Sequence, residues 1–190
     1  FIGRAFELKE LEEEYEKGIF ALSIIYGRRR VGKTYLIKEF LKRKRGYYFV
    51  ALESNALINL SLLSQAIYEA CGNLKGLPDF QDFEKALRYL FAYAEEHRII
   101  FVIDEYPYLA QSAEHISSLL QKLIDEYRDR SKLFLILCGS SMSFMENQVL
   151  GYKSPLYGRR TSQLKVQPFG YLEAVEFVPS YSYRDKAIVY

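Results

Sequence analysis

Short apolar runs alternate with amphipathic stretches along the chain. Five runs have the length and composition of strands, and they lie at 21–26, 47–51, 99–103, 133–138 and, as a shorter run, 163–166. The runs at 99–103 and 133–138 are apolar at every position. Such continuous apolarity is typical of strands that are covered on both faces of a parallel sheet.

Between these runs, apolar residues recur at the spacing of an α-helix. This spacing predicts helices at 5–17, 35–41 and 57–70, one from Asp79 or Asp82 to about Glu96, and one capped by Ser112 with its apolar face at 116–127. Strands that alternate with helices imply a mostly parallel sheet with helices on both faces. We therefore expect a three-layer α/β/α fold with a five-stranded sheet.

Composition adds limits on size, partners and location. The chain has 190 residues, 49% of them hydrophobic, which suits one domain with a sizeable core. Its formal net charge of +2 is too small to indicate nucleic acid or a membrane surface. The longest fully apolar run, 133–138, is far too short to span a bilayer. We interpret Cys71 and Cys138 as reduced core residues of a cytoplasmic protein without a membrane partner. Because the chain starts at Phe1 rather than at a methionine, the sequence leaves open whether a leader or an upstream segment precedes it.

The stretch from Gly27 to Thr34, GRRRVGKT, fits the phosphate-binding pattern G-x-x-x-x-G-K-[ST]. It lies between a predicted strand and a predicted helix, where successive backbone N–H groups can point at phosphate oxygens. Lys33 would reach the β- and γ-phosphates, and the Thr34 hydroxyl would bind magnesium. The predicted nucleotide contacts are Gly27, Arg28, Arg29, Arg30, Val31, Gly32, Lys33, Thr34 and Tyr35.

Two carboxylates, Asp104 and Glu105, directly follow the apolar run 99–103. In an open α/β sheet, ligands bind beyond the carboxyl ends of the strands, where this pair would lie. Magnesium prefers hard oxygen ligands, so we assign Asp104 to the metal. Glu105 would then serve as the base that polarises an attacking water.

Two further polar groups are candidates: one directly follows the buried run 133–138, and the other lies in the polar segment between the fourth and fifth strands. Ser140, preferred over Ser141, would hydrogen-bond the γ-phosphate or the attacking water, although small polar residues also suit a turn. Arg159 and Arg160 form a basic pair, and arginine stabilises charge on a transferring phosphoryl group, in cis or from a neighbouring molecule. A plain surface pair explains these arginines equally well, and the sequence does not select between the two.

Several of these segments together resemble the archaeal-type ATPase family of AAA+ P-loop ATPases, near the signalling (STAND) NTPases. The matching blocks are FIGRAFEL at 1–8, GRRRVGKT at 27–34, FVIDEYPYL at 101–109, LILCGSS at 135–141, YGRRT at 157–161 and QPFGYLEA at 167–174. The resemblance implies an ASCE-type sheet in the order 5-1-4-3-2, ATP as the nucleotide, and a sensor-1 position at Ser140. It also implies that Phe1, Ile2, Gly3 and Arg4 lie near the adenine.

The resemblance further implies that a helical lid follows the core. We accordingly predict an ATPase core at 1–170 and the start of a linker or lid at 171–190. The leading hypothesis for function is magnesium-dependent hydrolysis of ATP to ADP and phosphate. The alternatives are a nucleotide-gated switch with little hydrolysis, and a DNA-associated motor suggested by the basic stretches 28–30, 42–45 and 159–160. A kinase that acts on a small molecule is disfavoured, because no acceptor-binding lid is recognisable in the sequence. The edge at Arg159 and Arg160 would face a second copy or a partner protein.

Overall fold

A five-stranded parallel sheet forms the centre of the molecule. The computed structural model describes residues 3–73, 76–177, 182 and 184–185. The strands are β1 (Ala21–Tyr26), β2 (Gly46–Val50), β3 (Ile99–Asp104), β4 (Leu133–Gly139) and β5 (Ser162–Lys165). They pair in the order β2-β3-β4-β1-β5, and every pair is parallel. This order is the predicted 5-1-4-3-2 read from the other edge, and the prediction is confirmed.

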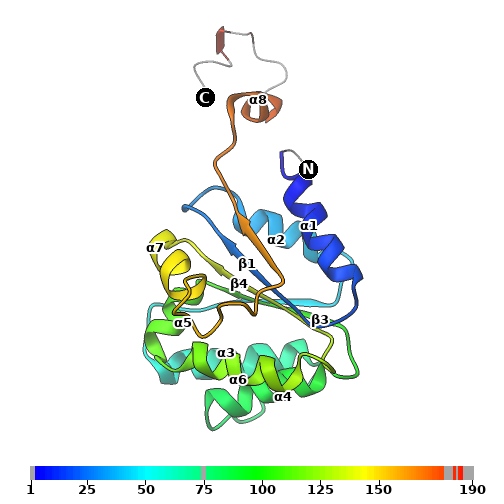
Figure 1. Ribbon diagram of the computed structural model, residues 1–190, viewed down its shortest axis with the longest axis vertical. Coiled ribbons are helices and arrows are strands. Elements are labelled where there is room, and N and C mark those ends of the chain that lie inside the picture. The colour runs from blue at the N-terminus through cyan, green and yellow to red at the C-terminus, as the bar shows by residue number, and fades with distance from the viewer. Residues whose placement is uncertain (1–2, 74–75, 178–181, 183, 186–190) are drawn as a thin grey trace.

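Helices cover both faces of this sheet, as the alternating pattern predicts (Figure 1). Helices α1 (Ala5–Glu16) and α2 (Lys33–Leu41) pack on one face. Helices α3 (Ala56–Ala70), α4 (Phe83–Tyr93), α5 (Tyr106–Ser112) and α6 (Ile116–Tyr127) pack on the other. Strands β1, β3 and β4 are buried at every position, because the sheet centre is sandwiched between the two layers.

The region after β3 departs from the prediction for Ser112. A helix that was not predicted, α5, begins directly after Glu105 with Pro107 in its first turn, where proline's missing N–H costs nothing. Ser112 is the last residue of that helix, and its hydroxyl donates to the Leu109 carbonyl at 3.0 Å. The residue at the N-cap of α6 is the exposed His115, so the prediction that Ser112 caps this helix is wrong.

Other boundaries shift by a few residues. Helix α4 starts after Asp82, whose carboxylate accepts from the Lys85 N–H at 2.8 Å, and it ends at Tyr93 rather than near Glu96. The segment between β4 and β5 holds a short helix α7 (Met142–Phe144) and the π-helical turn η1 (Met145–Val149). Beyond β5 come α8 (Tyr171–Ala174) and the 3-10 turn η2 (Val175–Phe177).

Helix α8 lies outside the sandwich, at the end of the molecule where α1 begins (Figure 1). It begins where the predicted linker or lid begins. Much of the stretch after Phe177 lies outside the described residues, so the predicted boundary at 170 stays a prediction. In the described part of the chain, no helix has the length and apolar content that crossing a membrane requires.

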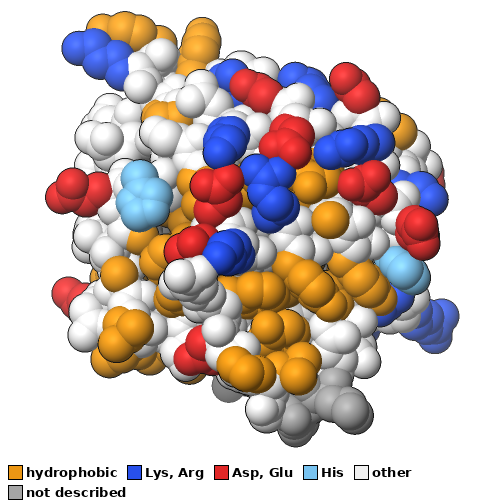
Figure 2. Space-filling model, turned by 90° about the horizontal axis from the view of Figure 1, so that it is seen from below, with side chains coloured by type: hydrophobic (Ala, Val, Ile, Leu, Met, Phe, Trp, Pro, Cys, Tyr) orange, Lys and Arg blue, Asp and Glu red, His pale blue; other side chains and the backbone are white. Residues whose placement is uncertain are grey.

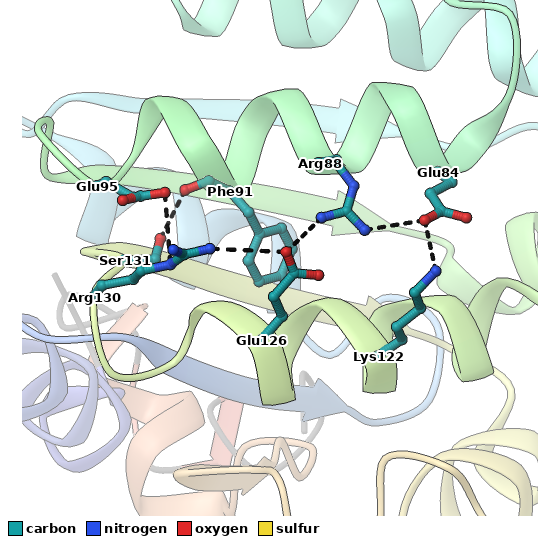
Figure 3. A network of polar contacts seen from close by, with 8 residues as sticks. All are labelled: Glu84, Arg88, Phe91, Glu95, Lys122, Glu126, Arg130 and Ser131. Carbon is teal, nitrogen blue, oxygen red and sulfur yellow. Dashed lines mark hydrogen bonds and ion pairs between the residues drawn. The ribbon is translucent and has the colours of Figure 1, made fainter.

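An ion-pair network joins the outer surfaces of α4 and α6 (Figure 3). Arg88 contacts Glu84 at 3.0 Å and Glu126 at 2.6 Å, and Lys122 contacts Glu84 at 2.7 Å. Figure 2 shows charged side chains of both signs side by side on this face, next to an apolar area. Because these pairs are partly exposed, we expect each to contribute at most about 1 kcal/mol. They lie across the contact between these two helices, whose packing depends on the buried apolar residues beneath them.

Candidate functional site

The loop between β1 and α2 is shaped by two glycines. A Cβ on Gly27 would lie 2.3 Å from the Val166 carbonyl oxygen, so no other residue fits there without moving the chain after β5. Gly32 has a φ of 92°, a left-handed conformation that side chains rarely adopt. The predicted phosphate loop therefore has the backbone course that its glycines suggest.

Helix α2 begins directly after this loop, at Lys33. No side chain caps its N-terminus, so the first N–H groups of the helix are left for another acceptor. An anion meets both these donors and the positive end of the helix dipole there. The exposed side chain of Thr34 lies in this first turn.

Lys33 folds back over the loop. Its ammonium group donates to the carbonyl oxygens of Gly27 at 2.7 Å and Arg28 at 2.8 Å, and only 8% of the residue is exposed. The loop thus holds a buried cation among backbone dipoles. A phosphate that enters the loop would offer this ammonium a charged acceptor in place of two neutral ones.

Asp104 is the last residue of β3, at the edge of the sheet where the phosphate loop follows β1, and it is 8% exposed. One carboxylate oxygen accepts from the Glu105 N–H at 2.8 Å, and the other accepts from the Tyr48 hydroxyl. The same hydroxyl lies 3.4 Å from the Thr34 hydroxyl. Tyr48 therefore bridges the two predicted metal ligands, which come from α2 and β3. A hydroxyl and a carboxylate that share one hydrogen-bonding neighbour supply oxygen ligands of the kind that Mg²⁺ takes, so the residues present fit the ion.

Burial keeps the neutral groups around Asp104 protonated. Burial, together with the hydrogen bond to Asp104, raises the pKa of Tyr48 well above its usual value. Burial and the nearby Asp104 carboxylate also raise the pKa of the Cys138 thiol. Asp104 therefore faces a neutral phenol and a neutral thiol.

Glu105 lies next to Ser140, which directly follows the neighbouring strand β4. The Ser140 hydroxyl lies 3.1 and 3.2 Å from the two carboxylate oxygens of Glu105 and donates to them. Because β3 and β4 are adjacent and parallel, their carboxyl ends bring the predicted base and the predicted sensor together. The backbone at Glu105 is left-handed, with φ at 52° and ψ at 41°.

The arginines of the loop lie at its rim. Arg28, Arg29 and Arg30 are exposed, and Arg29 donates to the Tyr108 hydroxyl at 3.2 Å. Tyr35 is 62% exposed on the outer side of α2. Val31 is buried and contributes its carbonyl to a contact with Arg4.

Arg4 has a structural role that sequence reasoning missed. It is 4% exposed, and its guanidinium donates to the Val31 carbonyl at 2.9 Å and to the Gln167 carbonyl at 2.5 Å. The same group stacks over the Phe169 ring at 4.1 Å, and Gly3 lies against that ring. Arg4 thus ties the N-terminal segment to the phosphate loop and to the chain after β5. Phe1 and Ile2, predicted to lie near the adenine, are outside the described residues.

A hollow of about 330 Å³ opens beside the phosphate loop. It is lined by Gly27, Arg28, Met142, Lys165, Val166, Gln167 and Pro168. It therefore lies between the loop and the segment that leaves β5.

The two arginines before β5 lie away from this site. Thr161, the next residue, hydrogen-bonds Leu22 near the start of β1, whereas the phosphate loop follows the end of that strand. At about 3.3 Å per residue, most of the length of β1 separates them. Arg159 is held by Asp125 through two hydrogen bonds, at 2.9 and 2.7 Å. Arg160 makes no hydrogen bond or ion pair within the described ranges. The structure thus does not bring either arginine to the loop of its own chain.

Comparison with known proteins agrees with this geometry. The family model described as an ATPase domain predominantly from Archaea matches residues 1–186. An uncharacterised protein of Methanocaldococcus jannaschii is 33% identical over 190 residues, which cover 100% of this chain and 41% of that protein.

Two solved structures share the fold. The Walker-type ATPase PABY2304 of Pyrococcus abyssi has a TM-score of 0.69 and 24% identity, over 94% of this chain and 57% of its own. The ORC2 protein of Aeropyrum pernix, in ADPNP–ADP complexes, has a TM-score of 0.67 and 19% identity, over 100% of this chain and 53% of its own. The chain thus spans about half the length of the relatives that it matches. The predicted fold of an AAA+ type P-loop ATPase is confirmed.

Proposed function

The chain belongs to the family of ATPase domains found predominantly in Archaea, and from this premise we propose that it binds ATP with Mg²⁺ and hydrolyses it to ADP and phosphate. The observation that carries the proposal is the convergence of Thr34, Asp104 and Glu105 beside the phosphate loop. A nucleotide site without the two metal ligands and a base could bind ATP but would lack the groups that hydrolysis needs.

Each residue has a distinct task in this proposal. The loop N–H groups and the Lys33 ammonium bind the β- and γ-phosphates, and Lys33 exchanges its two carbonyl partners for phosphate oxygens. Thr34 and Asp104 would hold Mg²⁺, which neutralises charge on the phosphates when bound. Glu105 accepts the proton of the attacking water. Ser140 orients the Glu105 carboxylate through its hydrogen bond.

The hollow beside the loop is our candidate place for the nucleoside. It continues from Gly27 along the chain after β5, and Arg4 holds that chain against the loop. Arg4 is almost fully buried. Gly3 and Arg4 therefore support this region and do not form the surface of the hollow. The choice of adenine over guanine follows from the family.

Arg160 is the arginine that we propose for a contact with a neighbouring molecule. Arg159 is occupied by Asp125, while Arg160 has no such partner among the described residues. Since both arginines lie at the far end of β1 from their own phosphate loop, a catalytic arginine here would serve a second copy.

The proposal is tested by comparing wild type with Glu105→Gln and Lys33→Ala in single-turnover hydrolysis, using the intact protein. We expect Glu105→Gln to bind ATP as the wild type does and to hydrolyse it about 10²–10⁴-fold more slowly, because only the base is removed. Lys33→Ala should lose most ATP binding, because the phosphates lose their buried cation.

Exposed Lys9→Ala serves as the matched control and should keep both properties. If the wild type and Glu105→Gln bind ATP equally and neither hydrolyses it above background, the domain is a nucleotide-gated switch instead. Equal turnover by the two proteins would remove Glu105 from the role of base.

A further inference from the structure

Tyr48 occupies a position in the site that none of the recognised motifs explains. It lies on β2, one of the two edge strands of the sheet, where it pairs with Val102 of β3. Asp104 is two residues further along β3, and side chains two residues apart point to the same face of a sheet. The register therefore places Tyr48 on the face that carries α2, within reach of both Asp104 and Thr34.

The contacts of Asp104 show what Tyr48 does there. One oxygen of the carboxylate is held by the Glu105 N–H at 2.8 Å, and the second is held by the Tyr48 hydroxyl. With both oxygens bound, the carboxylate cannot rotate freely about its Cβ–Cγ bond. The hydroxyl also lies 3.4 Å from Thr34, so the restrained carboxylate faces the threonine that would share the ion.

We propose that Tyr48 is a positioning residue for the metal: its hydroxyl holds the Asp104 carboxylate toward Thr34 and so presets the pair for Mg²⁺ that arrives with the nucleotide. This inference rests on the proposed function. Residues that hydrogen-bond a metal ligand without contacting the metal typically raise the affinity for the metal about 10–100-fold. Tyr48 acts through Asp104 and needs no contact with the nucleotide.

The chain provides a matched control in the preceding residue. Tyr47 lies on the opposite face of β2, where its ring stacks on Phe101 at 6.0 Å and its hydroxyl donates to Glu69 at 2.9 Å. Tyr47→Phe and Tyr48→Phe remove the same atom from neighbouring positions of one strand. Only the Tyr48 hydroxyl contacts the two candidate metal ligands, Thr34 and Asp104.

The experiment measures binding rather than turnover. Binding of a fluorescent ADP analogue to the intact protein is measured in EDTA, and Mg²⁺ is then titrated into the protein saturated with ADP. We expect Tyr48→Phe to bind ADP in EDTA as the wild type does. Its dissociation constant for Mg²⁺ should rise by at least about 10-fold. Tyr47→Phe should match the wild type in both measurements.

Combining variants tests whether Tyr48 acts through Asp104. Asp104→Asn should weaken Mg²⁺ binding, and adding Tyr48→Phe to it should produce no further loss, because the group being positioned is already altered. Unchanged or tighter Mg²⁺ binding by Tyr48→Phe would overturn the proposal, since the hydroxyl would then be idle or compete with the ion. A wild type that binds no ADP would refute the proposed function itself.

Discussion

At position 105 the backbone is left-handed, with φ at 52° and ψ at 41°, although the residue is a glutamate. Residues other than glycine adopt this conformation at a cost of about 1–2 kcal/mol. Strained residues of this kind concentrate at functional sites, where the surrounding structure holds them in place. Here the turn directs the Glu105 carboxylate to Ser140 at the end of β4, and the strain is the consequence of that placement.

The strain can be measured by comparing Glu105→Gly with Glu105→Ala. Both variants lose the carboxylate and its bond to Ser140, so their difference isolates the backbone. We expect the glycine variant to have the larger free energy of unfolding, by about 1 kcal/mol, as measured by urea denaturation. At an ordinary helical position the order is reversed, and the alanine variant has the larger free energy of unfolding by about 1 kcal/mol. A larger free energy of unfolding for Glu105→Ala than for Glu105→Gly would show that the left-handed turn stores no strain.

At the scale of elements, the site depends on contacts between segments that are distant in sequence. Arg4 precedes α1, yet its guanidinium holds the Val31 carbonyl of the phosphate loop and the Gln167 carbonyl after β5. Because Arg4 is buried, its charge is compensated by these carbonyls and by Glu7 at 2.9 Å. The loop is therefore braced from outside its own strand–loop–helix unit.

Arg4→Ala tests this bracing. The substitution leaves two carbonyls without their charged donor, and hydrogen bonds to charged groups contribute about 1.5–3 kcal/mol each. We expect the free energy of unfolding to fall by about 2–4 kcal/mol in urea denaturation. Lys9→Ala, on the exposed side of α1, should change it by less than about 0.5 kcal/mol. Similar values for the two variants would show that Arg4 does not brace the loop.

For the whole molecule, the parallel sheet decides which groups meet. Strands that run in one direction end at one edge, so the phosphate loop, Asp104, Glu105 and Ser140 gather there. The arginines before β5 lie near the start of β1 instead, at the opposite edge. Head-to-tail contact between copies would place the arginine edge of one molecule against the loop edge of the next.

A complementation experiment tests Arg160 in this arrangement. We expect Arg160→Ala to bind ATP normally and to hydrolyse it at least about 10³-fold more slowly, the lower end of the effect of a catalytic arginine. Mixing it with Glu105→Gln should restore hydrolysis, because each molecule then supplies the group that the other lacks. Arg159→Ala should hydrolyse ATP as the wild type does. No recovery on mixing would argue against an arginine shared between copies.

Three of the nine basic residues in the stretches that suggested DNA form ion pairs with acidic residues in the described part of the chain. Lys42 contacts Glu39 at 2.6 Å, Lys44 contacts Glu12 at 2.7 Å, and Arg159 contacts Asp125 at 2.7 Å. Charges balanced in this way contribute less to binding phosphate backbones than free ones do. The sequence shows the number of basic residues along the chain but not which of them have acidic neighbours in space.

The sequence predicted the elements that depend on local pattern. The apolar runs at 99–103 and 133–138 predicted buried strands, and the glycines of the phosphate loop predicted its turn, because burial and backbone freedom depend on residue type. It missed α5 because an acidic pair shortly before Pro107 also suits a turn, and only the burial of Tyr106 and Leu109 favours a helix there.

The amino-acid sequence by itself determined the alternation of strands and helices, the phosphate loop and the identity of the acidic pair, since these are properties of neighbouring residues. The tertiary structure alone decided that Tyr48 bridges Thr34 and Asp104, that Arg4 braces the loop, and that Asp125 pairs with Arg159. Each of these depends on the register and packing of segments far apart in the chain. That geometry follows from how the whole core packs, and no local pattern encodes it.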